Sequence, residues 1–195
     1  MRQTPAWFHQ SLAALLFLLL TLVGCRRPAD PQVTSSATAT PLSFAAYENK
    51  AGLNLIYPMD WEYVPVTEGL LLFGEPETIS LERPGASVTV FRLPPESAGA
   101  DLQQTFDHYV ENGPLQSGYQ TVTETASGTL GGREALEISV EKGETDDQPA
   151  MRVFITGAQT ESGVTYILAA AAPQADWDEH WLTFQLLLQS VEFNE

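Results

Sequence analysis

The sequence predicts an α+β domain in which an antiparallel β-sheet is flanked by helices. Between residues 53 and 93, and again between 119 and 172, apolar residues alternate or run over strand lengths. Gly, Pro or charged residues separate these stretches, as is typical of strands joined by turns. Two other segments, one between the strand-rich regions and one after them, show helical spacing. We therefore expect an α+β sandwich.

The first strand-rich region predicts a meander of antiparallel strands. Its second extended piece opens at Trp61, directly after the stretch LNLIYP and the pair Met59-Asp60. Every piece is bounded by Gly, Pro or charged residues. The expected strands are 53–58, 61–66, 69–74, 78–82 and 87–93.

A short amphipathic helix follows this meander. Asp101 is placed to cap its first turn, and Asn112-Gly113-Pro114 is expected to end it. Its apolar positions repeat at i, i+4, i+7 and i+8, and they are Leu102, Phe106, Tyr109 and Val110.

Four further strands and a second helix complete the predicted domain. Gly131-Gly132 and 161–163 are expected to form hairpin turns. The second helix should open at Pro173 with an Asp176 cap and lay an aromatic stripe on the sheet as core, before a short closing strand, SVEF. The strands are 119–127, 133–141, 151–159 and 164–172, and the stripe is Trp177, Trp181, Phe184 and Leu188.

The N-terminal residues 1–24 have the profile of a signal peptide. Arg2 precedes an uncharged apolar run, 11–23, which is shorter than the roughly 20 residues of a membrane-spanning helix. The run ends in Leu-Val-Gly-Cys at residues 22–25, which resembles the bacterial lipoprotein signal, or lipobox. The resemblance implies that the Cys25 thiol receives a diacylglyceryl group and becomes the new N-terminus. An ordinary secretory signal is the alternative.

After Cys25 the composition changes, and a single acidic domain follows. Residues 26–41 are rich in Pro, Ser, Thr and Ala, so we expect 25–41 to be the lipidated cysteine with a flexible tether. Residues 42–195 are of the size of one domain. Because Cys25 is the only cysteine, this domain cannot form an internal disulfide.

The charge of the chain argues against a nucleic-acid partner. Lys and Arg number 9 against 25 Asp and Glu, a net charge of −16. Removal of residues 1–24 takes away Arg2 alone and leaves 8 against 25, or −17. A domain this acidic is not drawn to nucleic acid by long-range electrostatics. The acidic side chains are expected to serve solubility, with a basic protein partner or divalent cations as alternatives.

Three stretches resemble the PsbP-like superfamily and related bacterial lipoprotein domains. The opening AYENKAGLNLIYPMDWEY carries the family's glycine, alternating apolar residues and Pro-x-x-Trp, the internal GGREALEISVE follows a glycine turn, and the ending SVEF carries the closing pattern. The resemblance implies an antiparallel sheet between helices, an α/β/α sandwich, and a role in binding or assembly without catalysis. The matched residues are Gly52, Leu53, Leu55, Tyr57, Pro58, Trp61, Gly132, Ala135, Ser190, Val191 and Phe193.

Candidate chemical groups are few and dispersed. His108 beside Asp107, and His180 with Asp176 at i−4, are more readily explained as polar helix faces than as metal sites. Ser127 and Ser162 have neighbouring glycines but do not fit the strained elbow of a serine hydrolase, so hairpin turns explain them better. No phosphate loop or dinucleotide fingerprint is found, and no cofactor is expected. The acidic loop with Glu144, Asp146 and Asp147 offers oxygen ligands for calcium but lacks the order of an EF-hand.

We therefore expect a lipoprotein anchored to the cell membrane through Cys25, with its domain on the extracytoplasmic side. Its expected role is to bind an envelope protein or to assist assembly, and not to catalyse a reaction. Two alternatives remain, an envelope hydrolase with a dispersed active site and a divalent-cation binder. A deep polar pocket holding His108 or His180 with a carboxylate favours the enzyme, whereas a shallow surface with an exposed apolar patch favours the binding protein.

Overall fold

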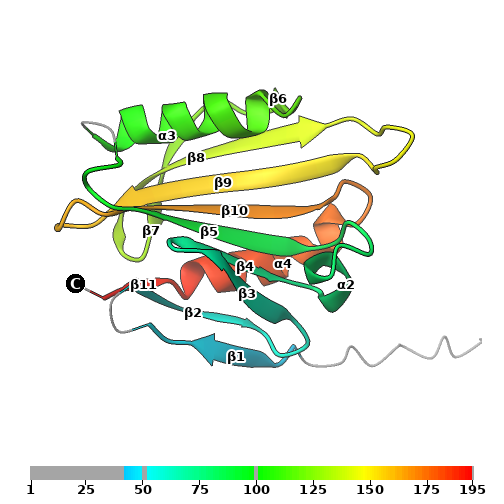
Figure 1. Ribbon diagram of the computed structural model, residues 1–195, viewed down its shortest axis with the longest axis horizontal. Coiled ribbons are helices and arrows are strands. Elements are labelled where there is room, and N and C mark those ends of the chain that lie inside the picture. Colours follow the sequence, from blue (N-terminus) through cyan, green and yellow to red (C-terminus); the bar gives the residue numbers. More distant parts are fainter. Residues whose placement is uncertain (1–41, 50–51, 99–100, 195) are drawn as a thin grey trace, which may run out of the picture. The chain divides into compact units, whose positions relative to one another are not determined.

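Two antiparallel sheets, with helices on both faces of the larger one, form the domain (Figure 1). A computed structural model describes residues 42–49, 52–98 and 101–194. The predicted signal peptide, Cys25 and tether lie outside these residues. The described elements are β1 (Phe44–Tyr47), β2 (Leu53–Pro58), β3 (Glu62–Thr67), β4 (Leu70–Gly74), α2 (Pro76–Ile79), β5 (Ser87–Leu93), α3 (Leu102–Val110), a π-helical turn η1 (Glu111–Leu115), β6 (Gln120–Thr121), β7 (Ala126–Leu130), β8 (Arg133–Lys142), β9 (Met151–Gln159), β10 (Thr165–Pro173), α4 (Trp177–Gln189) and β11 (Glu192–Phe193).

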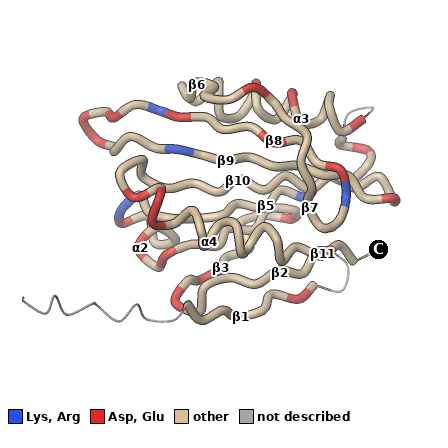
Figure 2. The backbone as a smooth tube through the Cα atoms, turned by 180° about the vertical axis from the view of Figure 1, so that it is seen from behind, with Lys and Arg blue, Asp and Glu red and all other residues tan. Residues whose placement is uncertain are grey.

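The main sheet has eight strands and the small sheet has three. The main sheet runs in the order β3-β4-β5-β10-β9-β8-β6, with β7 also paired to β8, and the small sheet runs β1-β2-β11. All the pairings are antiparallel. In Figures 1 and 2, α3 lies on one face of the main sheet, and α4 lies on the other. The predicted fold class, an antiparallel sheet flanked by helices, is confirmed.

Aromatic rings of α4 pack against the alanine-rich strand β10. Ala170 and Ala172 are fully buried on the α4 side of the sheet, in the same core cluster as Trp177 and Phe184. Methyl-sized groups let the helix approach closely, and the large rings fill the space between helix and strand. The ring centroids of Trp177 and Phe184 are 5.4 Å apart, and that of Trp61, at the entry to β3, lies 6.2 Å from that of Phe184. The stripe of α4 is core, as predicted.

The opposite face of the main sheet is covered by α3. The helix begins as predicted, with the Asp101 carboxylate accepting a hydrogen bond from the Gln104 N–H at 2.8 Å. Phe106 is fully buried and packs on Gly157 of β9, where a Cβ would lie only 2.9 Å from the ring. A residue larger than glycine there would displace the ring, so Gly157 permits this close helix contact.

The small sheet is joined to the end of α4 by Ser190. Its hydroxyl accepts the Ile56 N–H of β2 at 2.9 Å and donates to the Leu187 carbonyl at 2.7 Å. β11 follows immediately and pairs with β2. Phe193 of β11 stacks on Tyr166 and lies over Gly131, whose φ of 57° belongs to the predicted hairpin turn. The predicted closing strand is therefore confirmed.

Residues 78–82 form no strand, contrary to the prediction. The segment begins with α2, and Pro76 occupies its first turn, where a fixed φ and a missing N–H are both compatible with a helix. The Thr78 and Ile79 N–H groups donate to the Glu75 carbonyl. The Glu75 carboxylate in turn accepts the Ala86 N–H at 3.2 Å and closes the loop. This local hydrogen bonding overrides the β-branched character of the segment.

The predicted end of the first helix at Asn112-Gly113-Pro114 is also wrong. The chain continues through Gly113 and Pro114 as the π-helical turn η1. The wider turn carries the proline without an α-helical i−4 hydrogen bond. The Asn112 side chain donates to the His108 carbonyl at 2.9 Å, which satisfies a backbone acceptor at the junction.

The predicted strand 119–127 divides into β6 and the beginning of β7. Both pair with β8, but Thr121 lies opposite Val140 and Ala126 opposite Glu137, so β6 and β7 are separated by two more residues than their partners. The Thr123 hydroxyl fills the interruption by accepting the Ser139 N–H at 2.9 Å. The periodicity is kept on both sides of this bulge, but the strand is not continuous.

Asp176 precedes α4 as predicted, but it does not cap the helix with its side chain. Its φ and ψ are −105° and 1°, and its carboxylate accepts no capping hydrogen bond. Its backbone carbonyl accepts the N–H groups of Glu179 and His180 instead. The buried contacts of the stripe hold this end of the helix without a side-chain cap.

The edge of the main sheet is formed by β3, all of whose residues are exposed. Pro65 lacks an N–H group, and the pairing with β4 shifts register between Pro65 and Thr67. A proline and an irregularity both interrupt the row of free backbone groups that an edge strand presents.

Replacing Phe184 by Ala should lower the free energy of unfolding by about 3–5 kcal/mol, because its fully buried ring fills the space over the alanines of β10. Urea denaturation followed by circular dichroism measures this change. Leu182→Ala is the matched control, since Leu182 is 57% exposed on the same helix and should change stability by less than about 0.5 kcal/mol. Equal losses in the two variants would contradict the described packing of α4.

Candidate binding site

His180 contacts Glu75 and has no described contact between its side chain and that of Asp176, the residue at i−4. Its Nε2 lies 3.9 Å from a Glu75 carboxylate oxygen, and both side chains are partly exposed. The other Glu75 oxygen accepts the Ala86 N–H. The pair joins α4 to the start of α2.

His108 and its neighbour Asp107 turn to different partners. The Asp107 carboxylate accepts two 2.9 Å hydrogen bonds from the Gln103 amide, whereas His108 Nδ1 lies 3.1 Å from the Asn112 amide nitrogen. His108 is exposed and lines shallow surface hollows beside α3. Next to it, burial raises the pKa of Tyr109 to about 12, so that phenol stays protonated near neutral pH.

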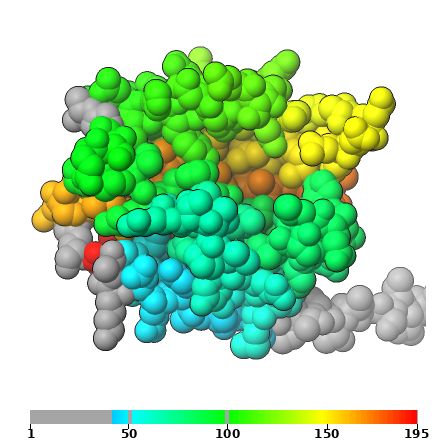
Figure 3. All heavy atoms as spheres, viewed as in Figure 1, coloured from blue at the N-terminus to red at the C-terminus, as the bar shows by residue number. Residues whose placement is uncertain are grey.

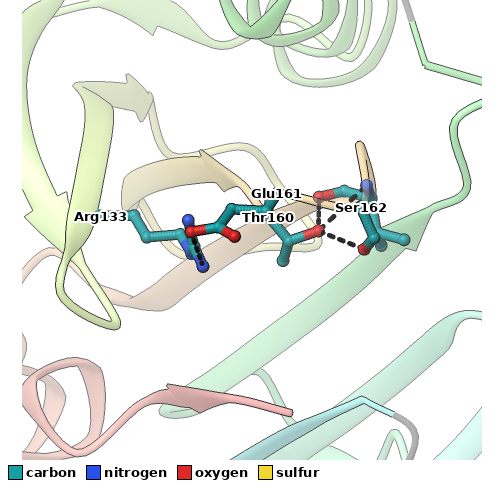
Figure 4. Close-up of polar contacts among 5 residues, drawn as sticks. Arg133, Thr160, Glu161 and Ser162 are labelled. Carbon is teal, nitrogen blue, oxygen red and sulfur yellow. Dashed lines mark hydrogen bonds and ion pairs between the residues drawn. The ribbon is translucent and has the colours of Figure 1, made fainter. Parts of the chain in front are cut away.

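The two candidate serines lack the partners of a nucleophile. Ser162 lies in the β9–β10 turn, as predicted, and its hydroxyl is 2.9 Å from the Thr160 hydroxyl (Figure 4). Arg133 and Glu161 form an ion pair beside them, 3.6 Å between the nearest atoms. Ser127 lies within β7 and not in the expected turn. No histidine is described as a partner of either hydroxyl.

The acidic loop does not assemble a metal site. Glu144, Asp146 and Asp147 lie exposed between β8 and β9, where the predicted hairpin loop is found. Among the described residues, no group of three or more His, Cys, Asp or Glu side chains converges well enough to hold a metal ion. Figure 2 shows acidic residues spread over loops and helices and not gathered at one place.

A pocket of about 280 Å³ opens between the small sheet and the main sheet. Strands β1 and β2 form one wall, β3, β4 and β5 form the other, and β10 contributes Tyr166. Most of the lining is apolar, and none of the described lining residues is acidic. They are Tyr47, Asn49, Gly52, Leu53, Pro65, Thr67, Gly69, Leu71, Val90, Arg92 and Tyr166.

Arg92 and Tyr166 enter this pocket side by side. They are directly opposite each other in the β5–β10 pairing, a relation that places Cβ atoms about 4.5–5.5 Å apart. Arg92 follows Val88 and Val90 on the same face of β5, and both valines are buried. Arg92 is the next residue of that row, but it is exposed where the strand reaches the pocket.

Within the described part of the chain, the Arg92 guanidinium has no ion-pair partner and the Tyr166 hydroxyl has no hydrogen-bond partner. Arg133 and Arg152 pair with Glu161 and Glu141, but no described carboxylate lies within ion-pair distance of Arg92. Tyr166 is only 3% exposed, and no described residue hydrogen-bonds to its hydroxyl. This hydroxyl would lie 3.5 Å from a Cβ at Gly52, which also lines the pocket.

The edge strand β3 carries an exposed apolar area. Val64 and Val66 of the edge strand β3 are 38% and 52% exposed. In Figure 3, strands of the main sheet remain visible between α3 and the β3–β4 hairpin, so α3 covers only part of its face. The hollow that holds His108 also holds the carboxylates of Asp101, Asp107 and Glu111, but it is open to solvent and not an enclosed pocket.

Sequence reasoning missed the pocket. The alternation of Val88, Val90 and Arg92 in SVTVFRL was a partial signal, because it places Arg92, itself exposed, on the same face of the strand as two buried valines. The remaining walls come from segments far apart in the chain, and no local pattern joins Tyr47 to Tyr166.

Comparison with protein-family models finds no match, and comparison with curated proteins finds none either. Solved structures do match. The cyanobacterial PsbP protein, CyanoP, of Synechocystis sp. PCC 6803 superposes with a TM-score of 0.56 at 13% identity, over 83% of this chain and 98% of that one. The fold is PsbP-like.

Two other proteins share the PsbP-like fold. LpqN of Mycobacterium tuberculosis, described as involved in cell envelope biogenesis, gives a TM-score of 0.52 at 16% identity over 81% of this chain and 88% of that one. The Ran-binding protein Mog1p of Saccharomyces cerevisiae gives a TM-score of 0.54 at 9% identity, over 79% of this chain and 97% of that one. At these identities the similarity establishes the fold alone.

The residues that carried the sequence resemblance belong to the structural core of this PsbP-like fold. Leu53, Leu55 and Trp61 are buried in the cluster under α4, and Val191 joins them. Ser190 links the end of α4 to β2. The resemblance therefore rested on packing positions, which explains why it predicted the fold and not a site.

No described helix is long and apolar enough to cross a membrane. The longest is α4, with 13 residues.

Replacing Glu137 by Gln should stabilise the domain at pH 7 and have little effect near pH 4. Burial raises the pKa of Glu137 above its ordinary value of 4.5. The folded chain therefore binds a proton on Glu137 more tightly than the unfolded chain does. This proton binding adds to the free energy of unfolding in full below pH 4.5, and the added stability is lost as the pH rises through the raised pKa. Thermal unfolding of wild type and variant across this range measures the difference.

Glu134→Gln is the control for this measurement, because Glu134 is exposed on the same strand. Its effect should change little with pH. A Glu137→Gln variant that is less stable than wild type at pH 7 would contradict the assigned cause.

Proposed function

We propose that this protein is a lipid-anchored extracytoplasmic binding protein that carries no catalytic centre. The observation that carries the proposal is the pocket between the two sheets, whose described walls contain apolar groups, Arg92 and neutral polar side chains but no nucleophile, general base or metal set. Ligand sites are of this kind, mostly apolar with a few placed polar groups.

The anchor is inferred from the sequence. The charged head, the apolar run and the lipobox agree on acylation of Cys25. Two or three long acyl chains, at about 0.8 kcal/mol per buried CH₂, hold a protein stably on a membrane. The thiol would be joined to a diacylglyceryl group, and the domain from residue 42 onward would lie on the extracytoplasmic side of the cell membrane.

The structural neighbours are compatible with this role. LpqN is described by its involvement in envelope biogenesis, and Mog1p by its binding of Ran. We infer a comparable binding or assembly role for this chain, with an envelope protein as a possible class of partner. The exposed Val64 and Val66 offer apolar contact area on the edge strand of the main sheet.

The envelope hydrolase is less well supported. Ser162 is engaged with Thr160, Ser127 is a strand residue, and His180 contacts Glu75. These groups come from separate elements, and the described contacts do not unite them in one site. The acidic loop likewise gives the cation-binding alternative no assembled ligand set among the described residues.

Replacing Cys25 by Ser should release the protein from the membrane fraction, because serine offers no thiol for lipid transfer. Fractionation of cells and intact-mass measurement test this. The wild type should sediment with membranes and carry the mass of the diacylglyceryl group, while the Cys25→Ser chain should lack that mass.

Ser36→Ala is the matched control, since it changes a hydroxyl residue of the tether and leaves the lipobox intact. It should fractionate as wild type does. An unmodified thiol in wild-type protein, or wild-type protein recovered free in the medium, would contradict the anchor.

A further inference from the structure

The pocket between the sheets has the chemistry of a site for a small organic anion. It contains Arg92, one of the few basic residues of a chain in which acidic residues outnumber basic ones by 25 to 9. Of the four described arginines, Arg133 and Arg152 pair with carboxylates, whereas Arg83 and Arg92 have no described ion pair. Arg92 differs from Arg83 in lining a pocket whose described lining contains no acidic residue. Arg92 is exposed there, and no described carboxylate neutralises its charge.

Tyr166 adds a second, independent indication of a ligand. Its ring is fixed by stacking on Phe193, 5.0 Å between centroids. The side chain is 97% buried, yet its hydroxyl is left without a hydrogen-bond partner among the described residues. The hydroxyl is not among the fully enclosed side-chain atoms that lack a partner, so it is accessible from the pocket that Tyr166 lines together with Arg92. A molecule bound there would accept its hydrogen bond.

The remaining walls define the body of the ligand. Leu53, Leu71 and Val90 supply aliphatic surface, and Tyr47 supplies the edge or face of an aromatic ring. The volume of about 280 Å³ is slightly below the roughly 300–1,000 Å³ that is typical of ligand pockets. The ligand is accordingly small, with one apolar group about the size of a single ring.

The geometry points to a binding site for a small amphipathic carboxylate, in which Arg92 and Tyr166 hold the carboxylate and the apolar walls take a ring or short chain. The planar guanidinium matches a carboxylate in a two-point hydrogen bond. The Tyr166 hydroxyl donates a third hydrogen bond to the same group. The apolar body excludes water from these contacts and so strengthens them.

This inference rests on the proposed function, since it names the ligand class of the same pocket. Its test is nevertheless separate. Acylation and location of Cys25 are read from mass and fractionation, whereas the pocket is read by titration. Failure of one leaves the other standing.

Isothermal titration of the full-length protein with 3-phenylpropionate tests the site, with 3-phenylpropanamide as its neutral isostere. We expect the carboxylate to bind saturably at about 1 mM or tighter and the amide at least about tenfold more weakly. Arg92→Gln should weaken carboxylate binding by about tenfold or more and leave amide binding unchanged. Equal affinities for the two probes would overturn the proposal, as would the absence of saturation by the carboxylate at millimolar concentration.

Two further variants separate the site from general effects of charge and folding. Arg83→Gln removes the same charge from an exposed loop outside the described pocket lining and should bind 3-phenylpropionate as wild type does. Tyr166→Phe should keep the unliganded melting temperature, because its hydroxyl has no described partner to lose, but should bind the carboxylate several-fold more weakly. Equal weakening by Arg83→Gln and Arg92→Gln, or wild-type affinity in Tyr166→Phe, would count against the assigned contacts.

Discussion

The packing of α4 on the alanines of β10 is the contact on which the rest of the structure depends. The chain has one cysteine, Cys25, outside the domain, so no internal disulfide can hold the layers together. The attachment comes from Trp177 and Phe184 lying over the methyl-sized side chains of Ala170 and Ala172. Close packing of this kind is sensitive to small changes in volume. The small sheet depends on the same contact, because β11 leaves directly from the end of α4.

The pocket follows from where this packing stops. Ala170, Ala172, Leu168 and Tyr166 lie on one face of β10, and α4 covers the alanine end of that row. At the other end Phe193 replaces the helix and stacks on Tyr166. The described residues that line the pocket come from strands and turns, and none comes from a helix. The pocket thus lies where α4 no longer covers the sheet.

Features that depend on neighbours in the sequence were predicted correctly. Features that depend on contacts between distant segments, including the pocket, were mispredicted or missed. Asp101 and the alternation of β9 depend on neighbours in sequence, so the start of α3 and the bounds of that strand agree with the structure. The segment after Pro76 was misassigned because the Glu75–Ala86 closure, eleven residues apart, decides its conformation. The pocket could not be read from the chain because its two key side chains meet only through strand pairing.

The proline and the register shift in the edge strand β3 have a consequence wherever many copies of the protein lie close together. With the lipid anchor proposed above, copies of this protein would meet in two dimensions, where repeated encounters favour the joining of sheets through free backbone groups. The proline and register shift of β3 leave few consecutive donors and acceptors for another copy to match. The side chains of Val64 and Val66 stay available for contact, while the backbone beneath them resists growth into a continuous fibre-like sheet.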